Sequence, residues 1–211
     1  MLKALIFDLN GVLINDTFDI VKVFQEAAKE GGLKVPTKKA ILSTLGLTWP
    51  EMRKKIFGGE EKYKEILNKT WMKHEKDMKL MAGMEKILAS LNRKKAIVTS
   101  SAEPYLQRML KGYVDYFDAI ITAESTEKHK PDPEPLLLAC RKLEIKPNEA
   151  VYIGDRLIDF KTAKNAGMDF IGFLSGGTTE EEFKKAGAKK TIKSLSELLK
   201  LLNNFEPYTK Q

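Results

Sequence analysis

The 211-residue sequence has little cysteine and histidine and no long apolar run. Its one cysteine, Cys140, excludes a disulfide framework and a cysteine-based metal site. No segment reaches the roughly 18 apolar residues that suggest a membrane-spanning helix. Residues 1–8 lack the longer apolar stretch and the cleavage site of a secretion signal. We therefore expect a cytoplasmic protein with no membrane partner, either a monomer or a homodimer.

The charged residues leave a net charge of +7, from 36 Lys and Arg against 29 Asp and Glu. A basic protein favours anionic partners. The lysines are scattered, with no run of five or more and no interleaved aromatic residues that would stack on bases. We expect a small phosphorylated substrate as the partner and no nucleic acid, with most lysines forming a solvated surface.

Short apolar runs recur at five places and predict buried strands. They occupy residues 5–7, 96–99, 119–122, 150–153 and 170–174. From residue 80 onward, amphipathic segments typical of helices separate these runs. This alternation indicates an α/β fold with a parallel sheet.

Residues 16–79 differ because their apolar positions follow helical spacing almost throughout. Asp16 is expected to cap the first helix of this segment, and Gly31-Gly32 to end it. The simplest architecture is a Rossmann-like core of residues 1–15 and 80–211. A helical domain, residues 16–79, is then inserted after the first strand.

Polar residues stand where several of the predicted strands end. Asp8 and Thr99 follow apolar strands directly, Asp155 follows one after Gly154, and Lys130 follows another after a loop. Parallel strands bring such residues to one edge of a sheet, where open α/β sheets bind ligands. Each residue alone is typical of a turn or of the surface. Together, two carboxylates, a hydroxyl and an amine indicate a reactive site.

These residue types suit phosphoryl transfer. A carboxylate can attack phosphorus and form an acyl phosphate, and Mg²⁺ binds one or two carboxylates together with substrate phosphate. Asp8 and Asp155 suit these roles. Thr99 and Ser100 can hold phosphate oxygens, and Lys130 can neutralise negative charge beside them. We therefore expect Mg²⁺ as the cofactor.

Four segments resemble the motifs of the haloacid dehalogenase superfamily. They are Phe7-Asp8-Leu9-Asn10-Gly11-Val12-Leu13, Ile97-Val98-Thr99-Ser100-Ser101, Lys130-Pro131-Asp132-Pro133 and Gly154-Asp155-Arg156-Leu157-Ile158-Asp159. The resemblance covers nearly the whole chain and is strongest for the branch of phosphoglycolate phosphatases and β-phosphoglucomutases. It implies an α-helical cap, residues 16–79, and a magnesium-dependent phosphatase that acts on a small phosphorylated metabolite.

The resemblance also implies a role for each matching residue. Asp8 would be the nucleophile and would form a phosphoaspartate. The magnesium ligands would be Asp8, the backbone carbonyl of Asn10, Asp155 and Asp159. The phosphate-binding residues would be Thr99, Ser100 and Lys130. The specificity loop of the cap would include Thr48, Trp49 and Arg53. The favoured alternatives are that Trp49 is a core anchor and that Arg53 is a solvated charge.

Residue 10 departs from the family pattern. The family's phosphatases carry Asp there, which protonates the leaving group and then activates water, and such catalysis contributes about 10²–10⁴-fold in rate. Asn10 cannot transfer a proton. Three explanations are open: an introduced Asp-to-Asn exchange that traps an intermediate, a naturally slow or transfer-type enzyme, and a binding or regulatory protein.

The leading hypothesis is a phosphatase that is slow or impaired because of Asn10. The alternatives are a catalytically silent phosphate-binding or regulatory protein of the same fold and a phosphosugar mutase, which needs a base in the cap. Asp155 and Asp159 argue against a dehalogenase, because that branch lacks the paired metal acids. Arg156 is unusual at its position. Its alternatives are to pair with an acid at the site or to face solvent, and we expect it to face solvent.

Overall fold

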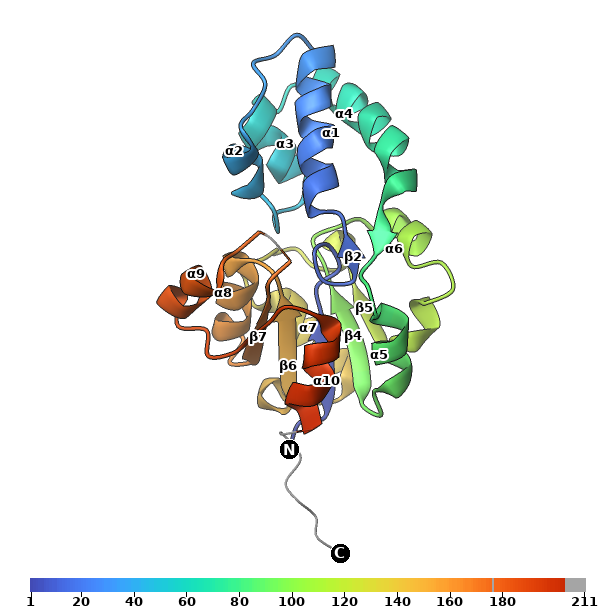
Figure 1. Cartoon of the computed structure of the whole chain (residues 1–211), viewed down its shortest axis with the longest axis vertical. Coiled ribbons are helices and arrows are strands. Elements are labelled where there is room, and N and C mark those ends of the chain that lie inside the picture. Colours follow the sequence, from blue (N-terminus) through green and yellow to red (C-terminus); the bar gives the residue numbers. More distant parts are fainter. Residues whose placement is uncertain (176, 204–211) are drawn as a thin grey trace, which may run out of the picture.

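A computed structural model describes residues 1–175 and 177–203. In this part of the chain the main sheet has six strands, all parallel, in the order β5-β4-β1-β6-β7-β8 (Figure 1). The strands are β1 (Ala4–Phe7), β4 (Lys94–Val98), β5 (Ala119–Ile121), β6 (Ala150–Gly154), β7 (Asp169–Phe173) and β8 (Thr191–Ile192). The expected α/β fold with a parallel sheet is confirmed.

Strand β1 lies in the middle of the sheet and aligns its neighbours. All four of its residues are completely buried, and it pairs in parallel with β4 on one side and β6 on the other. Phe7 is in register with Ile97 in β4 and with Ile153 in β6. The three strands therefore end at one level, and the residues that follow them emerge at the same edge.

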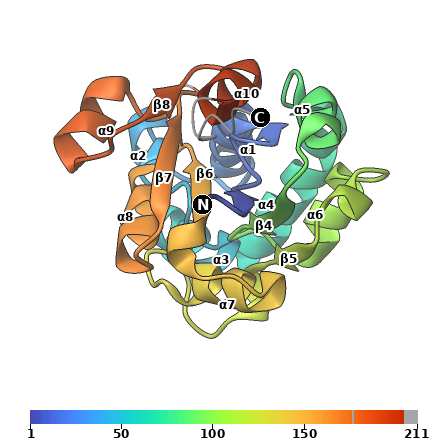
Figure 2. The same cartoon turned by 90° about the horizontal axis from the view of Figure 1, so that it is seen from below.

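Helices cover both faces of the sheet, as the view from below shows (Figure 2). Side chains of β1 alternate between the faces: Leu5 and Phe7 pack with residues of α5, α6 and α10, whereas Ala4 and Ile6 pack with residues of α7, α8 and α9. The helices are α5 (Met84–Ser90), α6 (Glu103–Met109), α7 (Glu134–Leu143), α8 (Leu157–Asn165), α9 (Glu180–Ala186) and α10 (Leu195–Asn203).

A helical lobe stands above the carboxyl edge of the sheet (Figure 1). It consists of α1 (Thr17–Glu30), α2 (Lys38–Leu42), α3 (Trp49–Phe57) and α4 (Glu61–His74). The lobe has its own core, in which Phe24 packs against Trp49 and Phe57 at ring-centroid distances of 5.1 and 5.5 Å. The buried apolar residues of the lobe thus form a cluster distinct from the two that flank the sheet.

The chain leaves the core and returns to it through a short antiparallel ribbon. This ribbon pairs β2 (Ile14–Asn15) with β3 (Lys79–Leu80). The division predicted from sequence, at residues 15/16 and 79/80, falls at this ribbon. The two connections between lobe and core therefore lie side by side.

All five predicted strands are confirmed, and the differences from the sequence-based expectation are local. The sequence pattern does not reveal β8, because a strand of two residues carries too little periodicity. The last helix of the lobe ends at His74 instead of near Lys79, since a 3-10 helix (Glu75–Asp77) follows it.

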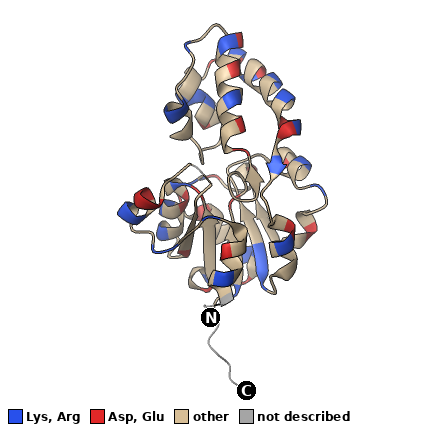
Figure 3. Cartoon of the chain, in the orientation of Figure 1, with Lys and Arg blue, Asp and Glu red and all other residues tan. Residues whose placement is uncertain are grey.

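Charged residues are spread over the core and the lobe, with Lys and Arg interspersed among Asp and Glu (Figure 3). Several exposed pairs lie one helical turn apart, such as Lys22 with Asp19 and Lys184 with Glu180. Pairs of this kind contribute little to stability. Across residues 1–175 and 177–203, no helix combines the length and the apolar character that crossing a membrane requires.

Candidate active site

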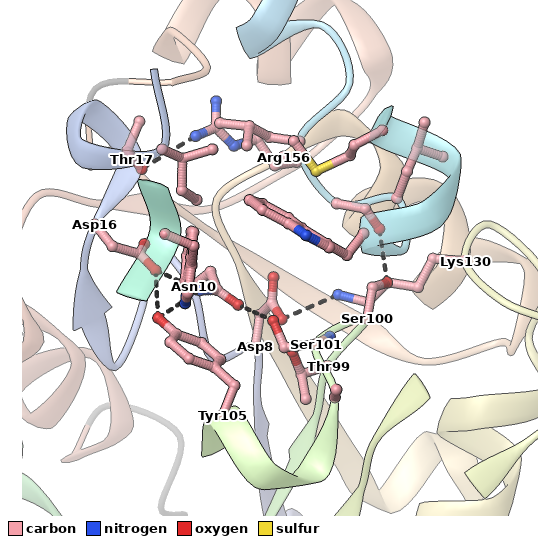
Figure 4. Close-up of a pocket in the computed structure, with 18 of the residues that line it drawn as sticks. Asp8, Asn10, Asp16, Thr17, Thr99, Ser100, Ser101, Tyr105, Lys130 and Arg156 are labelled. Carbon is pink, nitrogen blue, oxygen red and sulfur yellow. Dashed lines mark hydrogen bonds and ion pairs between the residues drawn. The ribbon is translucent and has the colours of Figure 1, made fainter. Parts of the chain in front are cut away.

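Asp8 follows β1 directly and lies at the carboxyl edge of the sheet. The residue is only 4% exposed. Its Oδ1 accepts a hydrogen bond from the backbone N–H of Leu9 at 2.8 Å and lies 3.1 Å from the ammonium of Lys130 (Figure 4). These two contacts hold the carboxylate at the bottom of a cavity.

Lys130 is a buried cation beside Asp8. Its Nζ donates to Oδ1 of Asp159 at 2.7 Å and to the hydroxyl of Tyr152 at 2.8 Å. Burial lowers the pKa of Lys130, but Asp159 and Asp8 outweigh burial and hold that pKa above its ordinary value. Lys130 therefore stays protonated at neutral pH and keeps its positive charge next to Asp8.

Three acids gather where a metal ion could be held. One oxygen from each of Asp8, Asp155 and Asp159 lies within 4.8 Å of the others. Oδ1 of Asp155 is buried and has no hydrogen-bond partner among the described residues. Gly11 approaches so closely that a Cβ there would lie 2.4 Å from Oδ2 of Asp155. A buried carboxylate oxygen left without a donor fits a divalent cation that prefers oxygen ligands.

Asp159 differs from the other two acids because both of its oxygens are already engaged. Oδ1 accepts from Lys130 at 2.7 Å and from Tyr152 at 3.2 Å, and Oδ2 accepts from the backbone N–H of Arg156 at 3.0 Å. Asp159 therefore orients Lys130 directly, and any contact with a metal ion would involve an oxygen that already accepts hydrogen bonds.

Two acids of this cluster, Asp8 and Asp155, are difficult to ionise in the metal-free protein. Burial raises the pKa of Asp8 to about 8 despite the opposing charge of Lys130. Repulsion from Asp159 and Asp155 adds to that rise. Burial also raises the pKa of Asp155 to about 6, against the charge of Arg156. Since three carboxylates face two cations, a further bound cation would favour their ionised forms.

Thr99 and Ser100 follow β4, as expected, and both line the cavity. Thr99 is 5% exposed, and its Oγ1 accepts from the backbone N–H of Ser101 at 3.0 Å. Ser100 reaches the lobe, because its hydroxyl donates to the carbonyl of Gly46 at 2.7 Å. Ser100 therefore links the sheet edge to the lobe.

The expectation that Arg156 faces solvent is wrong. The residue is 6% exposed, and its Nε lies 2.9 Å from Oδ2 of Asp155. Its Nη2 donates to the hydroxyl of Thr17 in the lobe at 3.1 Å. The acid at residue 155 and the lobe above it together provide partners that make burial of the guanidinium favourable.

The amide of Asn10 is bonded on both sides. Its Nδ2 donates to Oδ2 of Asp16 and to the hydroxyl of Tyr105 at 3.2 Å, and its Oδ1 accepts from the hydroxyl of Ser101 at 2.6 Å (Figure 4). The hydroxyl of Tyr105 also donates to Oδ2 of Asp16 at 2.9 Å. These bonds fix the orientation of the amide beside Asp8.

Sequence reasoning missed Asp16, Tyr105 and Ser101 as neighbours of Asn10. Asp16 occupies the position before helix α1, as expected of a cap, but its side chain makes no capping bond and points to the site instead. Asp16 is completely buried, and burial raises its pKa to about 6. The carboxylate six positions after Asn10 could have indicated this contact, but the pattern typical of a helix start accounts for Asp16 equally well.

A cavity of about 360 Å³ opens between the sheet edge and the lobe. Of the three specificity residues expected in the lobe, only Trp49 is among those lining it. Thr48 is bonded to Glu51 at the start of α3, and Arg53 pairs with Glu61 at 3.4 Å. The other site residues expected from sequence line the cavity, apart from Asp159, which lies behind Lys130.

Comparison with known proteins identifies the family of the chain. A family model described as haloacid dehalogenase-like hydrolase matches residues 5–173. A Clostridium perfringens protein provisionally named as the pyrophosphatase PpaX is 35% identical over 182 residues, which cover 82% of this chain and 84% of that protein. A phosphoglycolate phosphatase of Nitrosospira multiformis is 27% identical over 95% of this chain and 96% of its own.

The fold is likewise shared with solved structures. The crystal structure of a provisionally identified haloacid dehalogenase-like hydrolase from Bacteroides fragilis matches with a TM-score of 0.84 at 28% identity. The match covers 94% of this chain and 100% of that chain. The chain therefore belongs to the haloacid dehalogenase-like hydrolases and is a hydrolase of the phosphatase type.

Proposed function

We propose that the protein is a magnesium-dependent phosphatase that acts on a small phosphorylated metabolite through a phosphoaspartate at Asp8. The observation that carries this proposal is the buried pair of Asp8 and Lys130, 3.1 Å apart, beside the unpaired Oδ1 of Asp155 within the described structure. A nucleophile, a phosphate-binding cation and a metal ligand thus line one cavity.

In this proposal, Oδ2 of Asp8 attacks phosphorus, because Oδ1 is held by Leu9 and Lys130. A bond forms between Asp8 and phosphorus, the bond from phosphorus to the ester oxygen breaks, and the departing alkoxide takes a proton from water. Water then attacks phosphorus, frees Asp8 and releases phosphate, and its proton passes to solvent. Lys130 and Thr99 neutralise and orient the phosphate oxygens.

The residues proposed to hold magnesium are Asp8, Asp155 and the backbone carbonyl of Asn10. Asp159 contributes through Lys130 or through water, because its oxygens are already hydrogen-bonded. Bound magnesium supplies the positive charge that lets an anionic carboxylate approach an anionic phosphate.

The helical lobe, residues 16–79, is proposed to act as a cap over Asp8. The hydrogen bonds that join it to the sheet edge include those from Ser100 to Gly46 at 2.7 Å and from Arg156 to Thr17 at 3.1 Å. A closed cap excludes water, which strengthens electrostatic interactions with the bound phosphate.

Asn10 makes the proposed phosphatase slow, because an amide transfers no proton and this one is bonded through both its nitrogen and its oxygen. The same observation favours a second candidate, a catalytically silent phosphate-binding protein. A phosphosugar mutase has less support. The lobe is described without a gap, and its cavity-lining residues include one carboxylate, Asp16, and no imidazole. Both oxygens of Asp16 already accept hydrogen bonds, from Asn10, Tyr105 and the backbone N–H of Gly11.

Phosphate release from p-nitrophenyl phosphate tests the proposal. We expect turnover that requires Mg²⁺, disappears with a chelator and disappears in Asp8→Ala, together with phosphate covalently attached to the peptide that contains Asp8. Equal activity of Asp8→Ala and the wild type would contradict the proposal. Phosphate binding without turnover, both in the wild type and in Asn10→Asp, would favour the silent candidate.

A further inference from the structure

The lobe contributes an apolar wall to the cavity above Asp8. The cavity volume of about 360 Å³ lies toward the lower end of the roughly 300–1,000 Å³ typical of small-molecule sites. The apolar wall comes from α1, the loop before α3, α3 and α4 and consists of Ile20, Leu45, Leu47, Trp49, Met52, Trp71 and Met72. A phosphate bound at Asp8 would place its ester group against this wall.

Two tryptophans hold the apolar wall in place. The rings of Trp49 and Trp71 meet at a centroid distance of 4.7 Å and an angle of 70°. Phe24 supports Trp49 from the lobe core at 5.1 Å, and Tyr105 supports Trp71 from the sheet edge at 5.2 Å. Since the N–H of Trp71 already donates to Glu75 at 2.7 Å, a ligand meets mainly its carbon surface.

The cations around the cavity are already paired with carboxylates. Arg108 donates to both oxygens of Glu75, at 2.6 and 2.9 Å, and Arg156 lies 2.9 Å from Asp155. Lys130 lies at the sheet edge, where the transferred phosphate would bind. Within residues 1–175 and 177–203, the cavity therefore offers no unpaired cation to a second anionic group of a substrate.

We infer that the preferred substrates are phosphate monoesters of apolar alcohols, such as aromatic or branched ones, and that a second anionic group on the substrate is disfavoured. This inference rests on the proposed phosphatase function. A second carboxylate or phosphate would lose water against the apolar wall without gaining a counter-charge, which is costly. The phosphoglycolate and pyrophosphate in the names of two relatives both carry such a group.

Turnover of a matched pair of substrates tests the inference. Benzyl phosphate and phosphoglycolate are both phosphate esters of primary alcohols. The alcohol part of the first carries an aromatic ring, whereas that of the second carries a carboxylate. With Mg²⁺ present, we expect kcat/KM for benzyl phosphate to exceed that for phosphoglycolate at least tenfold. Equal values, or a preference for phosphoglycolate, would overturn the inference while leaving the proposed phosphatase intact.

A binding experiment separates the inference from turnover. Benzylphosphonate and phosphonoacetate resemble the two substrates but cannot be hydrolysed, and calorimetric titration with Mg²⁺ measures their affinities. We expect benzylphosphonate to bind at least tenfold more tightly. If benzylphosphonate binds more tightly but no phosphate ester is hydrolysed, the inference about the apolar wall is supported and the proposed phosphatase function is contradicted. Tighter binding of phosphonoacetate would overturn the inference whatever the turnover.

Changes in the apolar wall sharpen the test. Met72 is 55% exposed at the cavity, so a longer polar side chain is tolerated there. Met72→Lys adds an unpaired cation, and we expect it to shift the affinity ratio at least threefold toward phosphonoacetate, whereas the uncharged control Met72→Gln does not. Trp71→Ala should reduce the preference for benzylphosphonate at least fivefold. An unchanged ratio in both variants would overturn the inference.

Discussion

The floor and the roof of the cavity are built from opposite kinds of residue. The floor, at the sheet edge, carries charged side chains that are each at most 6% exposed and are joined by ion pairs of 2.7–3.1 Å: Asp8, Lys130, Asp155, Arg156 and Asp159. The roof is the apolar wall of the lobe, held by contacts between aromatic rings. In the proposed enzyme, reactivity would therefore depend on the floor and selectivity on the roof.

The comparison shows why the two parts are organised differently. Charged groups of the floor must be held within a few tenths of an ångström, and adjacent parallel strands in fixed register provide that precision. The roof needs shape and an absence of charge, which helices with their own hydrophobic core can supply. Changes to the floor should therefore affect every substrate, whereas changes to the roof should affect the choice among substrates.

Asp8→Asn should produce the largest effect and would mark the floor as the reactive part. Loss of the nucleophile should lower kcat/KM by roughly 10³-fold or more for any phosphate ester. The melting temperature should change little, because burial already favours the uncharged form of Asp8 and Lys130 keeps its hydrogen bond to Asp159. Phosphate release and circular dichroism measure the two effects. Activity within tenfold of the wild type would contradict the assigned role of Asp8.

Exchanging the amide at residue 10 with the acid at residue 16 should give the next largest effect, an increase in kcat. Asn10→Asp alone places a second carboxylate against Asp16, so the new acid meets a like charge. In Asn10→Asp/Asp16→Asn, residue 16 can donate to the new acid, and Tyr105 can donate to that acid while accepting from residue 16. We expect the double variant to raise kcat at least tenfold over the wild type.

The matched controls for this exchange are the two single variants, compared by steady-state phosphate release. Asn10→Asp should raise kcat less than the double variant does. Asp16→Asn alone should not raise kcat, because it supplies no proton-transferring group at residue 10. A single Asn10→Asp variant as fast as the double variant would show that Asp16 does not oppose an acid at residue 10.

Buried acids around the cavity should also make the free energy of unfolding depend on pH and on Mg²⁺. Burial raises the pKa of Asp8 to about 8 and those of Asp155 and Asp16 to about 6, compared with roughly 4 in the unfolded chain. The folded metal-free protein therefore binds protons more tightly than the unfolded chain. Its free energy of unfolding should fall as the pH rises from about 4 to 8.

Mg²⁺ should reverse this loss, because the ion favours the ionised carboxylates. At a concentration one hundred times its Kd, a ligand adds about 2.7 kcal/mol to the free energy of unfolding. Melting temperatures with and without Mg²⁺ should differ more near pH 8 than near pH 5. Asp155→Asn is the control, and in this variant Mg²⁺ should raise the melting temperature much less. An equal increase in melting temperature at both pH values would indicate that Mg²⁺ binds away from Asp8 and Asp155.

Ser100→Ala should have the smallest effect, because it alters one link between floor and roof. Losing the 2.7 Å hydrogen bond to Gly46 should cost about 1 kcal/mol. We expect KM for p-nitrophenyl phosphate to rise a few-fold with a smaller change in kcat. Ser43→Ala, which removes an exposed hydroxyl within the lobe, is the matched control. A larger fall in kcat than rise in KM would indicate that Ser100 acts mainly on the transferred phosphate.

The positions of the floor residues could be predicted from sequence because they depend on local signals. Asp8, Thr99 and Asp155 each end an apolar run, and parallel pairing brings such ends together. The strands with their intervening helices, and the helical character of residues 16–79, could likewise be predicted from apolar spacing. The assigned roles of these residues in catalysis and in metal binding remain predictions for the experiments above.

The misjudged residues share a physical cause, which is dependence on partners far away in the sequence. Arg156 was expected in solvent, but Thr17 in the lobe and the adjacent Asp155 bury it. Asp16 fits a helix cap by local pattern, yet Tyr105, 89 positions later, helps to turn its side chain to the site.

By itself, the sequence determined which chemical groups stand at the strand ends and where a helical insertion interrupts the sheet, because apolar periodicity and strand termination are local properties. The tertiary structure alone decided which groups meet: the amide of Asn10 with Asp16, Arg156 with Thr17, and the apolar wall with the phosphate site. Those pairings depend on how the lobe packs over the sheet, and no local pattern specifies that packing.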